Sequence, residues 1–285
     1  MQIPKLAVII PCYNEELCIE KTCRRLLEVL EMLVEKGKIS SDSYIYCIDD
    51  GSNDSTWSII ERLHSETPLV KGATFVRNYG NQKALIAGLE GVRDLGCDCV
   101  VSIDADLQQD ELSIEQFVDE YQKGYDIVLG VRNDRKTDNF FKKITAIMFY
   151  KLMNILGSKI AMNHSDYRLV SKKALDMMDL YHEKSLFLRG FFHELGLKTT
   201  TVKFNVKPRF AGQSKFNFIS LMGLALNGIT SFSIVPLRII YGLGFVMALF
   251  GFLMGLETIF EKIFLKLKLV AKLHAKHVYV RRIAA

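Results

Sequence analysis

Short apolar runs alternate with longer stretches of helical periodicity along the first 131 residues. The runs are four to six residues long and nearly all apolar, which is typical of parallel strands covered on both faces. They predict strands at residues 6–10, 44–49, 73–76, 99–104 and 127–131. The stretches between them predict helices at residues 16–35, 55–64, 82–95 and 112–122. This alternation predicts an α/β domain with a doubly wound, mostly parallel sheet.

A polar cluster follows each predicted strand. In such a sheet the carboxyl ends of the strands meet at one edge, and ligands bind in the crevice outside that edge. We therefore expect one ligand crevice built from five strand ends. The clusters are Pro11-Cys12-Tyr13-Asn14-Glu15, Asp49-Asp50-Gly51-Ser52, Arg77-Asn78-Tyr79-Gly80-Asn81, Asp104-Ala105-Asp106 and Arg132.

The apolar residues are concentrated near the C-terminus. Residues 216–237 carry no charge but hold polar residues at helical spacing, which predicts an amphipathic helix over 216–228 lying in a membrane interface. Residues 239–256 are 18 uncharged residues, enough for a transmembrane helix, although a helix buried in a soluble core is the alternative. In residues 257–285, apolar residues recur at helical spacing and lysines lie on the opposite helix face. This pattern predicts a basic amphipathic tail.

Charge is divided unevenly along the chain, whose overall net charge is +5. From Lys207 onward there are 11 Lys and Arg against two Glu, a net +9, which leaves −4 for the first 206 residues. A basic segment beside an apolar one suits an anionic membrane surface, where each Lys or Arg is worth about 1 kcal/mol. Because the basic residues are interleaved with aliphatic ones, nucleic acid is a weaker candidate.

The placement of the tail raises a conflict. The first apolar run is too short for a signal peptide, so the chain is expected to start in the cytosol. A single crossing by residues 239–256 would then put the Lys-rich tail outside, against the positive-inside bias. Either the apolar segment is re-entrant or a second crossing has been lost. The six cysteines form no Cys-x-x-Cys pair, which predicts reduced thiols and no zinc site.

Asp104-Ala105-Asp106 is the sharpest chemical feature. Two carboxylates one residue apart repel each other unless a cation lies between them, and hard divalent ions take carboxylate and phosphate oxygens. An isolated Asp-x-Asp is more often a pair of solvated turn residues. Here it follows the apolar run Val100-Val101-Ser102-Ile103, which favours a metal bound to a nucleotide diphosphate.

Asp49 and Asp50 form a second acidic pair. Asp-Gly makes a tight turn, and Ser52 or Asp54 could cap the next helix, but this leaves two adjacent acids unexplained. A carboxylate at a strand end can accept hydrogen bonds from a base N–H or a ribose hydroxyl. Because no Gly-x-Gly-x-x-Gly or Walker sequence is present, a dinucleotide cofactor or a P-loop is not expected.

These segments, taken in this order, resemble glycosyltransferase family 2, which has a nucleotide-sugar-binding GT-A fold. The resemblance lies in residues 8–16, 49–52, 78–84 and 104–108. Residues 165–169, 209–216 and 228–233 narrow it to the polyprenyl-phosphate branch, which includes dolichol-phosphate mannose synthases and, closest, bactoprenol (undecaprenyl-phosphate) glucosyltransferases. It covers about residues 5–256. It implies a GT-A catalytic domain over 1–208, an acceptor loop and interfacial helix over 209–238, a transmembrane helix over 239–256 and the tail over 257–285.

The resemblance also implies roles for individual residues. Asp166 would line the acceptor side or orient Arg168, and Arg132 could equally be an ordinary surface arginine. The implied catalytic residues are Asp106, Asp166 and Arg132. The implied nucleotide-sugar-binding residues are Pro11, Tyr13, Asn14, Glu15, Asp49, Asp50, Lys83, Asp104 and Ala105. Mg²⁺ or Mn²⁺ would be held by Asp104, Asp106 and Gln108, and the lipid phosphate or leaving diphosphate by Arg132, Arg168, Arg209, Ser214 and Lys215.

The implied activity is an inverting, metal-dependent transfer of a hexose, with glucose from UDP-glucose expected, to undecaprenyl phosphate. It would take place on the cytosolic face of a bacterial inner membrane, for cell-surface polysaccharide modification. The implied partners are membrane lipids and, as in related enzymes, further copies in a tetramer. One alternative is the same reaction with GDP-mannose, UDP-N-acetylglucosamine or an aminoarabinose donor. The other is a truncated, non-catalytic remnant that binds only nucleotide.

Overall fold

The structure is a computed structural model, and it describes residues 3–133, 164–180, 188, 191–192, 195–207 and 235–283. The chain divides into two compact units, Met1–Phe232 and Ser233–Ala285. The loop at 209–215 and the interfacial helix predicted at 216–228 lie outside the described residues.

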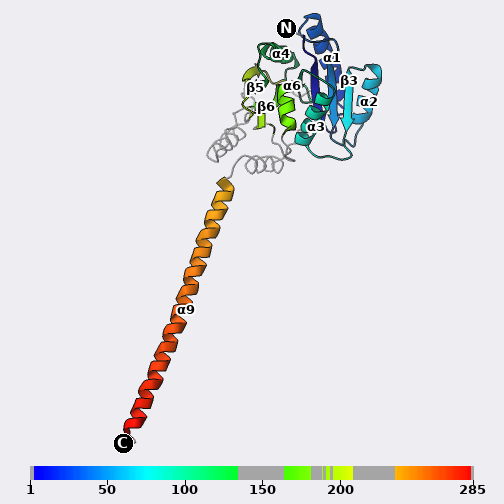
Figure 1. Cartoon of the computed structure of the whole chain (residues 1–285). Helices are drawn as coiled ribbons and strands as arrows, with labels where there is room; N and C mark the ends of the chain where they lie inside the picture. The colour runs from blue at the N-terminus through cyan, green and yellow to red at the C-terminus, as the bar shows by residue number, and fades with distance from the viewer. Residues whose placement is uncertain are drawn as a thin grey trace. The chain divides into compact units, whose positions relative to one another are not determined.

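The first unit is built on a seven-stranded sheet with the order β3-β2-β1-β4-β6-β5-β7 (Figure 1). β6 runs antiparallel to β4 and β5, whereas the other pairings are parallel. Since β2 and β4 flank β1, the chain leaves β1 on one side and later returns on the other, and this reversal marks the place where such sheets bind ligands. The strands are β1 (Leu6–Cys12), β2 (Tyr44–Asp49), β3 (Val70–Thr74), β4 (Cys99–Ser102), β5 (Ile127–Arg132), β6 (His164–Ser171) and β7 (Thr199–Phe204).

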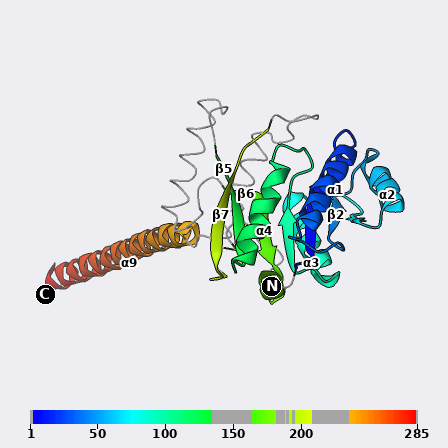
Figure 2. The ribbon, with the colours of Figure 1, turned by 90° about the horizontal axis from the view of Figure 1, so that it is seen from above.

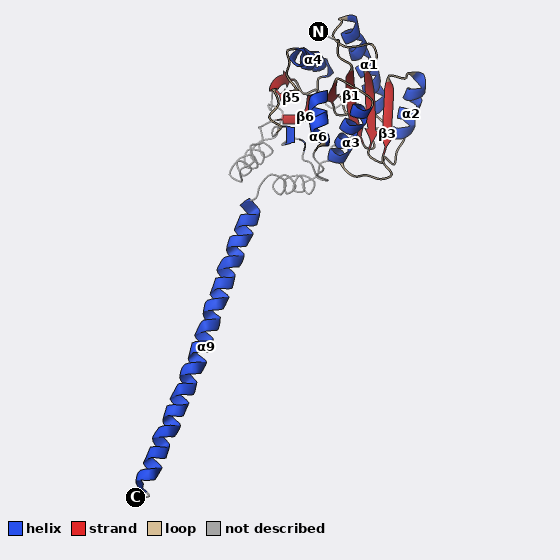
Figure 3. Cartoon of the chain, in the orientation of Figure 1, coloured by secondary structure: helices blue, strands red, loops and turns tan. Residues whose placement is uncertain are grey.

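Helices cover both faces of the sheet. One face packs against α1 (Ile19–Glu35), α2 (Thr56–Glu66) and α4 (Ile114–Gln122), which follows the 3₁₀ turn η1 (Glu111–Ser113). The other face packs against α3 (Asn81–Asp94) and α6 (Lys172–Asp179). β1 shows why the strand is apolar throughout, because Val8 and Ile10 join the first core and Ala7 and Ile9 the second. Figure 2 shows α2 at the end of the sheet opposite β7, and α4 contacts β5 and β7. Figure 3 shows the strands enclosed by helices.

The predicted doubly wound α/β fold is confirmed, with three local differences. β3 is Val70–Thr74, whereas the prediction was residues 73–76, because Phe75 and Val76 leave the sheet although they are apolar. β4 ends at Ser102 instead of Asp104. β6 and β7 were not predicted, and β6 carries charged residues whose partners are inside the protein. All six cysteines are free, as predicted, and the structure shows that all six are buried.

The second unit contains α9 (Val235–Ile283), a helix of 49 residues. Its segment Ile240–Lys276 is long and apolar enough to cross a membrane, with a mean hydropathy of 2.0 in its most apolar window and none of that window buried. Side chains such as Phe245, Phe250 and Phe252 are more than half exposed. An exposed apolar surface of this extent indicates membrane association. The predicted boundary at 256 falls inside one continuous helix, so the division into a spanning segment and a tail stays a prediction.

Candidate active site at the strand ends

The loops that follow β1 and β2 are joined by hydrogen bonds. The backbone N–H of Asn14 donates to Ser52 Oγ at 2.8 Å, and Asn14 Oδ1 accepts from the N–H of Asn53 at 2.8 Å. The N–H of Glu15 donates to Thr56 Oγ1 at 2.8 Å. Asn14 has a φ of 51°, a left-handed conformation that asparagine tolerates better than most residues. The two loops therefore form one unit at the edge of the sheet, and the predicted residues Asn14 and Glu15 lie in it.

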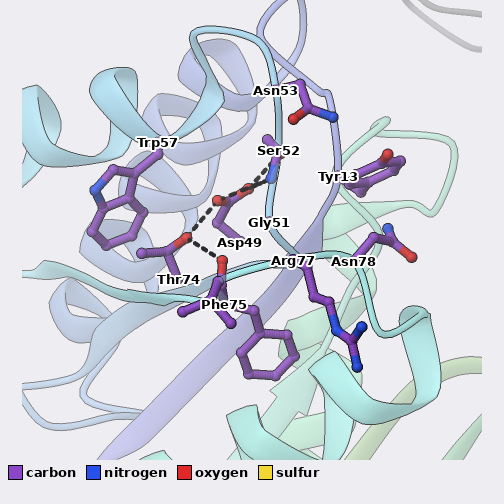
Figure 4. Close-up of a pocket in the computed structure, with 11 residues that line it drawn as sticks. Tyr13, Asp49, Gly51, Ser52, Asn53, Trp57, Thr74, Phe75, Arg77 and Asn78 are labelled. Carbon is purple, nitrogen blue, oxygen red and sulfur yellow. Dashed lines mark hydrogen bonds between the residues drawn. The ribbon is translucent and has the colours of Figure 1, made fainter.

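Asp49 lines a cavity of about 320 Å³ (Figure 4). Its carboxylate is 1% exposed and accepts hydrogen bonds from the Thr74 hydroxyl at 2.7 Å and from the hydroxyl and backbone N–H of Ser52. Aromatic side chains, the Asp49 carboxylate and the Arg77 guanidinium around a cavity of this size suit a planar, polar ligand such as a nucleobase. The lining consists of Tyr13, Asp49, Gly51, Ser52, Asn53, Trp57, Thr74, Phe75, Val76, Arg77 and Asn78.

Asp50, the other predicted nucleoside-binding acid, contacts a different part of the chain. Its carboxylate is buried and accepts from the backbone N–H groups of Tyr79 at 2.7 Å and Gly80 at 2.8 Å. These two groups lie immediately before α3, so Asp50 fixes the start of that helix. The Tyr79 ring has the Arg77 guanidinium at 4.9 Å and the ammonium of predicted Lys83 at 5.4 Å from its centre. Contact between Asp50 and a nucleoside stays a prediction.

Gly51 permits the close approach of two strand ends. Its φ is +66°, and a Cβ at this position would lie 2.6 Å from the Cα of Arg77. The turn after β2 and the chain after β3 can therefore meet around the cavity only if residue 51 has no side chain.

The segment after β4 holds Asp104 and Asp106 in a fixed turn. Asp106 is buried and its Oδ1 accepts from the backbone N–H of Gln108 at 3.0 Å. Leu107, between Asp106 and Gln108, has a φ of 55°, which is unusual for a leucine. The carbonyl of buried Ala105 accepts from the Thr22 hydroxyl at 2.6 Å. The turn is thus connected to α1. It follows β4, which pairs with β1 on the edge opposite β2.

Asp104 is held by a residue that sequence reasoning missed. Gln109 Nε2 donates to Asp104 Oδ2 at 2.6 Å, and the backbone N–H of Asp104 donates to Gln109 Oε1 at 3.0 Å. This use of the Asp104 N–H accounts for the end of β4 at Ser102. The sequence contains Gln109 beside the predicted Gln108, but spacing alone does not reveal which glutamine turns toward Asp104.

β6 brings Asp166 and Arg168 next to this turn. Ser102 is the register partner of Arg168, and its hydroxyl donates to the backbone carbonyl of Asp166. Arg168 is 3% exposed, and its guanidinium donates to Asp166 Oδ1 at 2.5 Å and to the carbonyl of Leu188 at 3.1 Å. The geometry thus contains the pairing in which Asp166 orients Arg168. A contact of Arg168 with phosphate, or of Asp166 with the acceptor, stays a prediction.

Of the remaining predicted site residues, the structure describes some and not others. Pro11 is buried in β1 opposite Ile48, and Arg132 is exposed at the end of β5. Arg209, Ser214 and Lys215 lie outside the described residues. One copy of the chain is described, so the tetramer also stays a prediction.

The donor set at the Asp104 turn fits a divalent ion completed by a ligand. Within the ranges that the structure describes, no three His, Cys, Asp or Glu side chains form a metal-binding group. Two carboxylates and the amide of Gln108 provide fewer oxygens than Mg²⁺ or Mn²⁺ requires. Magnesium is commonly bound by one or two carboxylates together with substrate phosphates. These residues therefore suit a metal shared with a diphosphate.

Comparison with known proteins decides the family. Residues 7–178 match the model of glycosyl transferase family 2. The chain belongs to this family. It is 43% identical over 260 residues to the uncharacterized glycosyltransferase YkoT of Bacillus subtilis, covering 91% of this chain and 77% of that protein. It is 39% identical over 263 residues to the bactoprenol glucosyl transferase of Shigella phage SfX, covering 91% of this chain and 82% of that protein.

The fold comparison agrees with the family. Glucosyl-3-phosphoglycerate synthase from Mycobacterium tuberculosis superimposes with a TM-score of 0.53 at 17% identity, covering 81% of this chain and 80% of that chain. At this identity the likeness concerns the fold alone. The α/β body of this family 2 chain is thus a GT-A fold.

Ion pairs to one buried carboxylate, that of Glu111, connect this GT-A core to the chain that follows β7. Glu111 is buried, and its carboxylate accepts from Lys207 Nζ at 2.7 Å and from Arg25 Nε at 3.0 Å. Burial acts to raise the pKa of Glu111, but hydrogen bonds from Lys207 and Arg25 outweigh it and lower that pKa. The charged form of Glu111 is therefore the form that stabilises the folded protein.

Replacing Gly51 by alanine should destabilise the protein more than the same change at Gly37. Both glycines have a φ of +66°, but nothing lies within 4 Å of a Cβ at Gly37. Gly37→Ala should cost about 1–2 kcal/mol for the left-handed conformation alone. Gly51→Ala should cost about 1–3 kcal/mol more because of the overlap with Arg77. Equal melting temperatures for the two variants would show that the strand ends can move apart.

Glu111→Gln should lower the melting temperature at neutral pH, and the gap to the wild type should close in acid. Because the pKa of Glu111 is lowered in the folded state, its contribution is present above the unfolded value near 4.5. It is lost as the pH falls through the folded pKa, where the wild type also becomes neutral. Thermal unfolding from pH 7 to pH 3 measures this, with Glu61→Gln on the exposed surface of α2 as control. A gap that does not depend on pH would contradict the ionic role.

Proposed function

We propose that this chain is an inverting hexosyltransferase that moves glucose from UDP-glucose to undecaprenyl phosphate. The observation that carries the proposal is the juxtaposition of two preformed parts along neighbouring strand ends. The aromatic cavity with Asp49 lies after β1, β2 and β3, and the Asp104 turn lies after β4, which is paired with β1. The 39% identity to a bactoprenol glucosyl transferase supports the lipid acceptor and the sugar.

On the donor side, each part has a separate task. The cavity holds the uracil and ribose, with Asp49 accepting from an N–H or a hydroxyl while Tyr13 and Trp57 enclose the rings. Asp104 faces the ribose and diphosphate, and Asp106 and Gln108 complete the oxygen donors. These three residues would hold Mg²⁺ or Mn²⁺, which would neutralise charge on the departing diphosphate. Residues already fixed by hydrogen bonds do not have to reorganise when that charge develops.

On the acceptor side, positioning matters more than proton removal. A phosphate monoester has a second pKa near 6, so it is mostly dianionic at neutral pH and needs no strong general base. A phosphate oxygen forms the new bond to the anomeric carbon as the bond to the diphosphate breaks, and UDP leaves. Attack from the face opposite the nucleotide inverts the configuration. Arg132, Arg209, Ser214 and Lys215 are the proposed donors to the phosphates, because guanidinium and ammonium groups suit their charge.

α9 provides the proposed link to the membrane that contains the acceptor. Its apolar segment follows the predicted acceptor loop in the sequence. We propose the cytosolic face of a bacterial inner membrane. A re-entrant segment needs a turn, and α9 continues from Val235 to Ile283 without one. A single crossing by α9 is therefore favoured over a re-entrant segment.

Two alternative functions would use the same site. Another hexose donor would use the same cavity and turn, and no described contact distinguishes the sugars. A non-catalytic remnant would bind UDP without transfer. The intact hydrogen bonds around Asp49 and Asp104 favour a working enzyme.

Membranes containing the chain should form a chloroform-extractable labelled lipid from radiolabelled UDP-glucose and undecaprenyl phosphate. Chelation of divalent metal should stop the reaction. Asp106→Asn should lower the rate by at least about 100-fold, because it removes a charge that faces the diphosphate. Asp94→Asn, whose side chain is 69% exposed on α3, is the matched control and should retain activity. Product only with GDP-mannose or UDP-N-acetylglucosamine would change the sugar, and UDP binding without any product would indicate the remnant.

A cysteine placed at the C-terminus should react with a membrane-impermeant maleimide in intact spheroplasts. The Ala285→Cys variant tests a single crossing of α9, and the wild type is the control because its six cysteines are buried. Labelling only after permeabilisation would place the tail on the cytosolic side. In that case α9 would lie along the inner leaflet, and the seven Lys and Arg after residue 256 would contact anionic headgroups.

A further inference from the structure

Gln109 makes a two-point contact with a single residue. Its side chain is 2% exposed, and its amide pairs with Asp104 through both of its functional groups. The oxygen accepts from the Asp104 backbone at 3.0 Å, and the nitrogen donates to the Asp104 carboxylate at 2.6 Å. Because a carboxamide is planar, holding both ends fixes the rotation of the Asp104 side chain relative to its own backbone.

The chain that leaves β7 holds Gln109 in turn. Val206 forms an antiparallel bridge with Gln109, and the backbone N–H of Lys207 donates to the carbonyl of Gln108 at 2.8 Å. The Lys207 ammonium lies 2.9 Å from Asp110 Oδ1 and 2.7 Å from Glu111 Oε2. Val206 and Lys207, which follow β7 at the far edge of the sheet, therefore contact three consecutive residues. These are Gln109, Asp110 and Glu111.

Charge explains why Asp104 needs this support. Asp104 and Asp106 are one residue apart, and burial of Asp106 increases the repulsion between carboxylates. The Gln109 N–H lowers this cost without adding a net charge. A lysine in its place would offset the repulsion too, but it would compete with a divalent ion for the same oxygens.

We propose that Gln109 is a positioning residue that orients the Asp104 carboxylate toward a divalent ion and a nucleotide diphosphate. The end of β7 keeps Gln109 in place through Val206 and Lys207. This inference rests on the proposed function for the identity of the ligand. The affinity for a diphosphate in the presence of metal should therefore depend on the Gln109 side chain, although that side chain contacts neither the metal nor the diphosphate.

Calorimetric titration of the full-length protein in detergent with UDP, with and without Mn²⁺, tests the proposal. Gln109→Met keeps the length of the side chain and removes both hydrogen bonds, so the Mn²⁺-dependent affinity for UDP should fall about tenfold. Affinity without Mn²⁺ should change much less. Gln122→Met on α4 is the matched control, because it removes a glutamine hydrogen bond to the carbonyl of Lys38 at 3.0 Å away from the strand ends.

Gln109→Glu separates orientation from simple packing, because it keeps the size of the side chain. Its carboxylate repels Asp104 instead of donating to it, so the Mn²⁺-dependent affinity for UDP should fall further than in Gln109→Met. An affinity equal to that of the wild type would overturn the orienting role.

Further outcomes keep the two proposals distinct. Wild-type affinity in Gln109→Met, with a melting temperature lowered as in Gln122→Met, would reduce Gln109 to a packing residue and overturn the inference. If Gln109→Met does not fold, Lys207→Met changes a partly exposed side chain and should give a smaller loss of the same Mn²⁺-dependent affinity. Unchanged binding in Lys207→Met would overturn the role of the Lys207 side chain in holding this segment. Failure of the wild type to bind UDP with any metal would refute the proposed function and, with it, this inference.

Discussion

The architecture of the site depends on one constraint, which is that a buried carboxylate must be surrounded by hydrogen-bond donors. Asp49 and Asp50 at the end of β2 and Glu111 in η1 are buried, and each obtains its donors from a different segment of the chain. Asp49 uses hydroxyls on the β2 turn and on β3, Asp50 uses the backbone before α3, and Glu111 uses Lys207 and Arg25. Because an unpaired buried charge is very costly, satisfying these groups determines how the loops meet.

The same hydrogen bonds prepare the site for chemistry. A transferase that stabilises charge on a departing diphosphate gains most from groups that are already oriented before the reaction. The left-handed conformations of Asn14 and Leu107 are tolerated because the surrounding hydrogen bonds hold both turns. Stability and preorganisation therefore come from the same contacts, and a change to a supporting residue such as Gln109 should affect ligand affinity as well as folding.

The two units are stabilised in different surroundings. The α/β body buries its apolar residues between a sheet and two layers of helices, whereas α9 exposes Phe245, Phe250 and Phe252 along most of its apolar segment. The backbone of α9 satisfies its own hydrogen bonds, which is what a lipid environment requires of a spanning segment. Beyond residue 256 the helix continues with lysines on its surface.

The sequence by itself determined the alternation of strands and helices, the polar strand ends and the apolar C-terminal helix, because these depend on local periodicity and composition. It also indicated Asp49, Asp104 and Asp106 through their position after apolar runs. Only the tertiary structure decided that β6 runs antiparallel with a buried Arg168, that β3 begins at Val70, and that Gln109 turns toward Asp104. Lys207 and Glu111 are 96 residues apart in the chain, and no local pattern couples them. Such partners are chosen by the register of the sheet and by the need to satisfy buried charge, and both arise only when distant segments pack together.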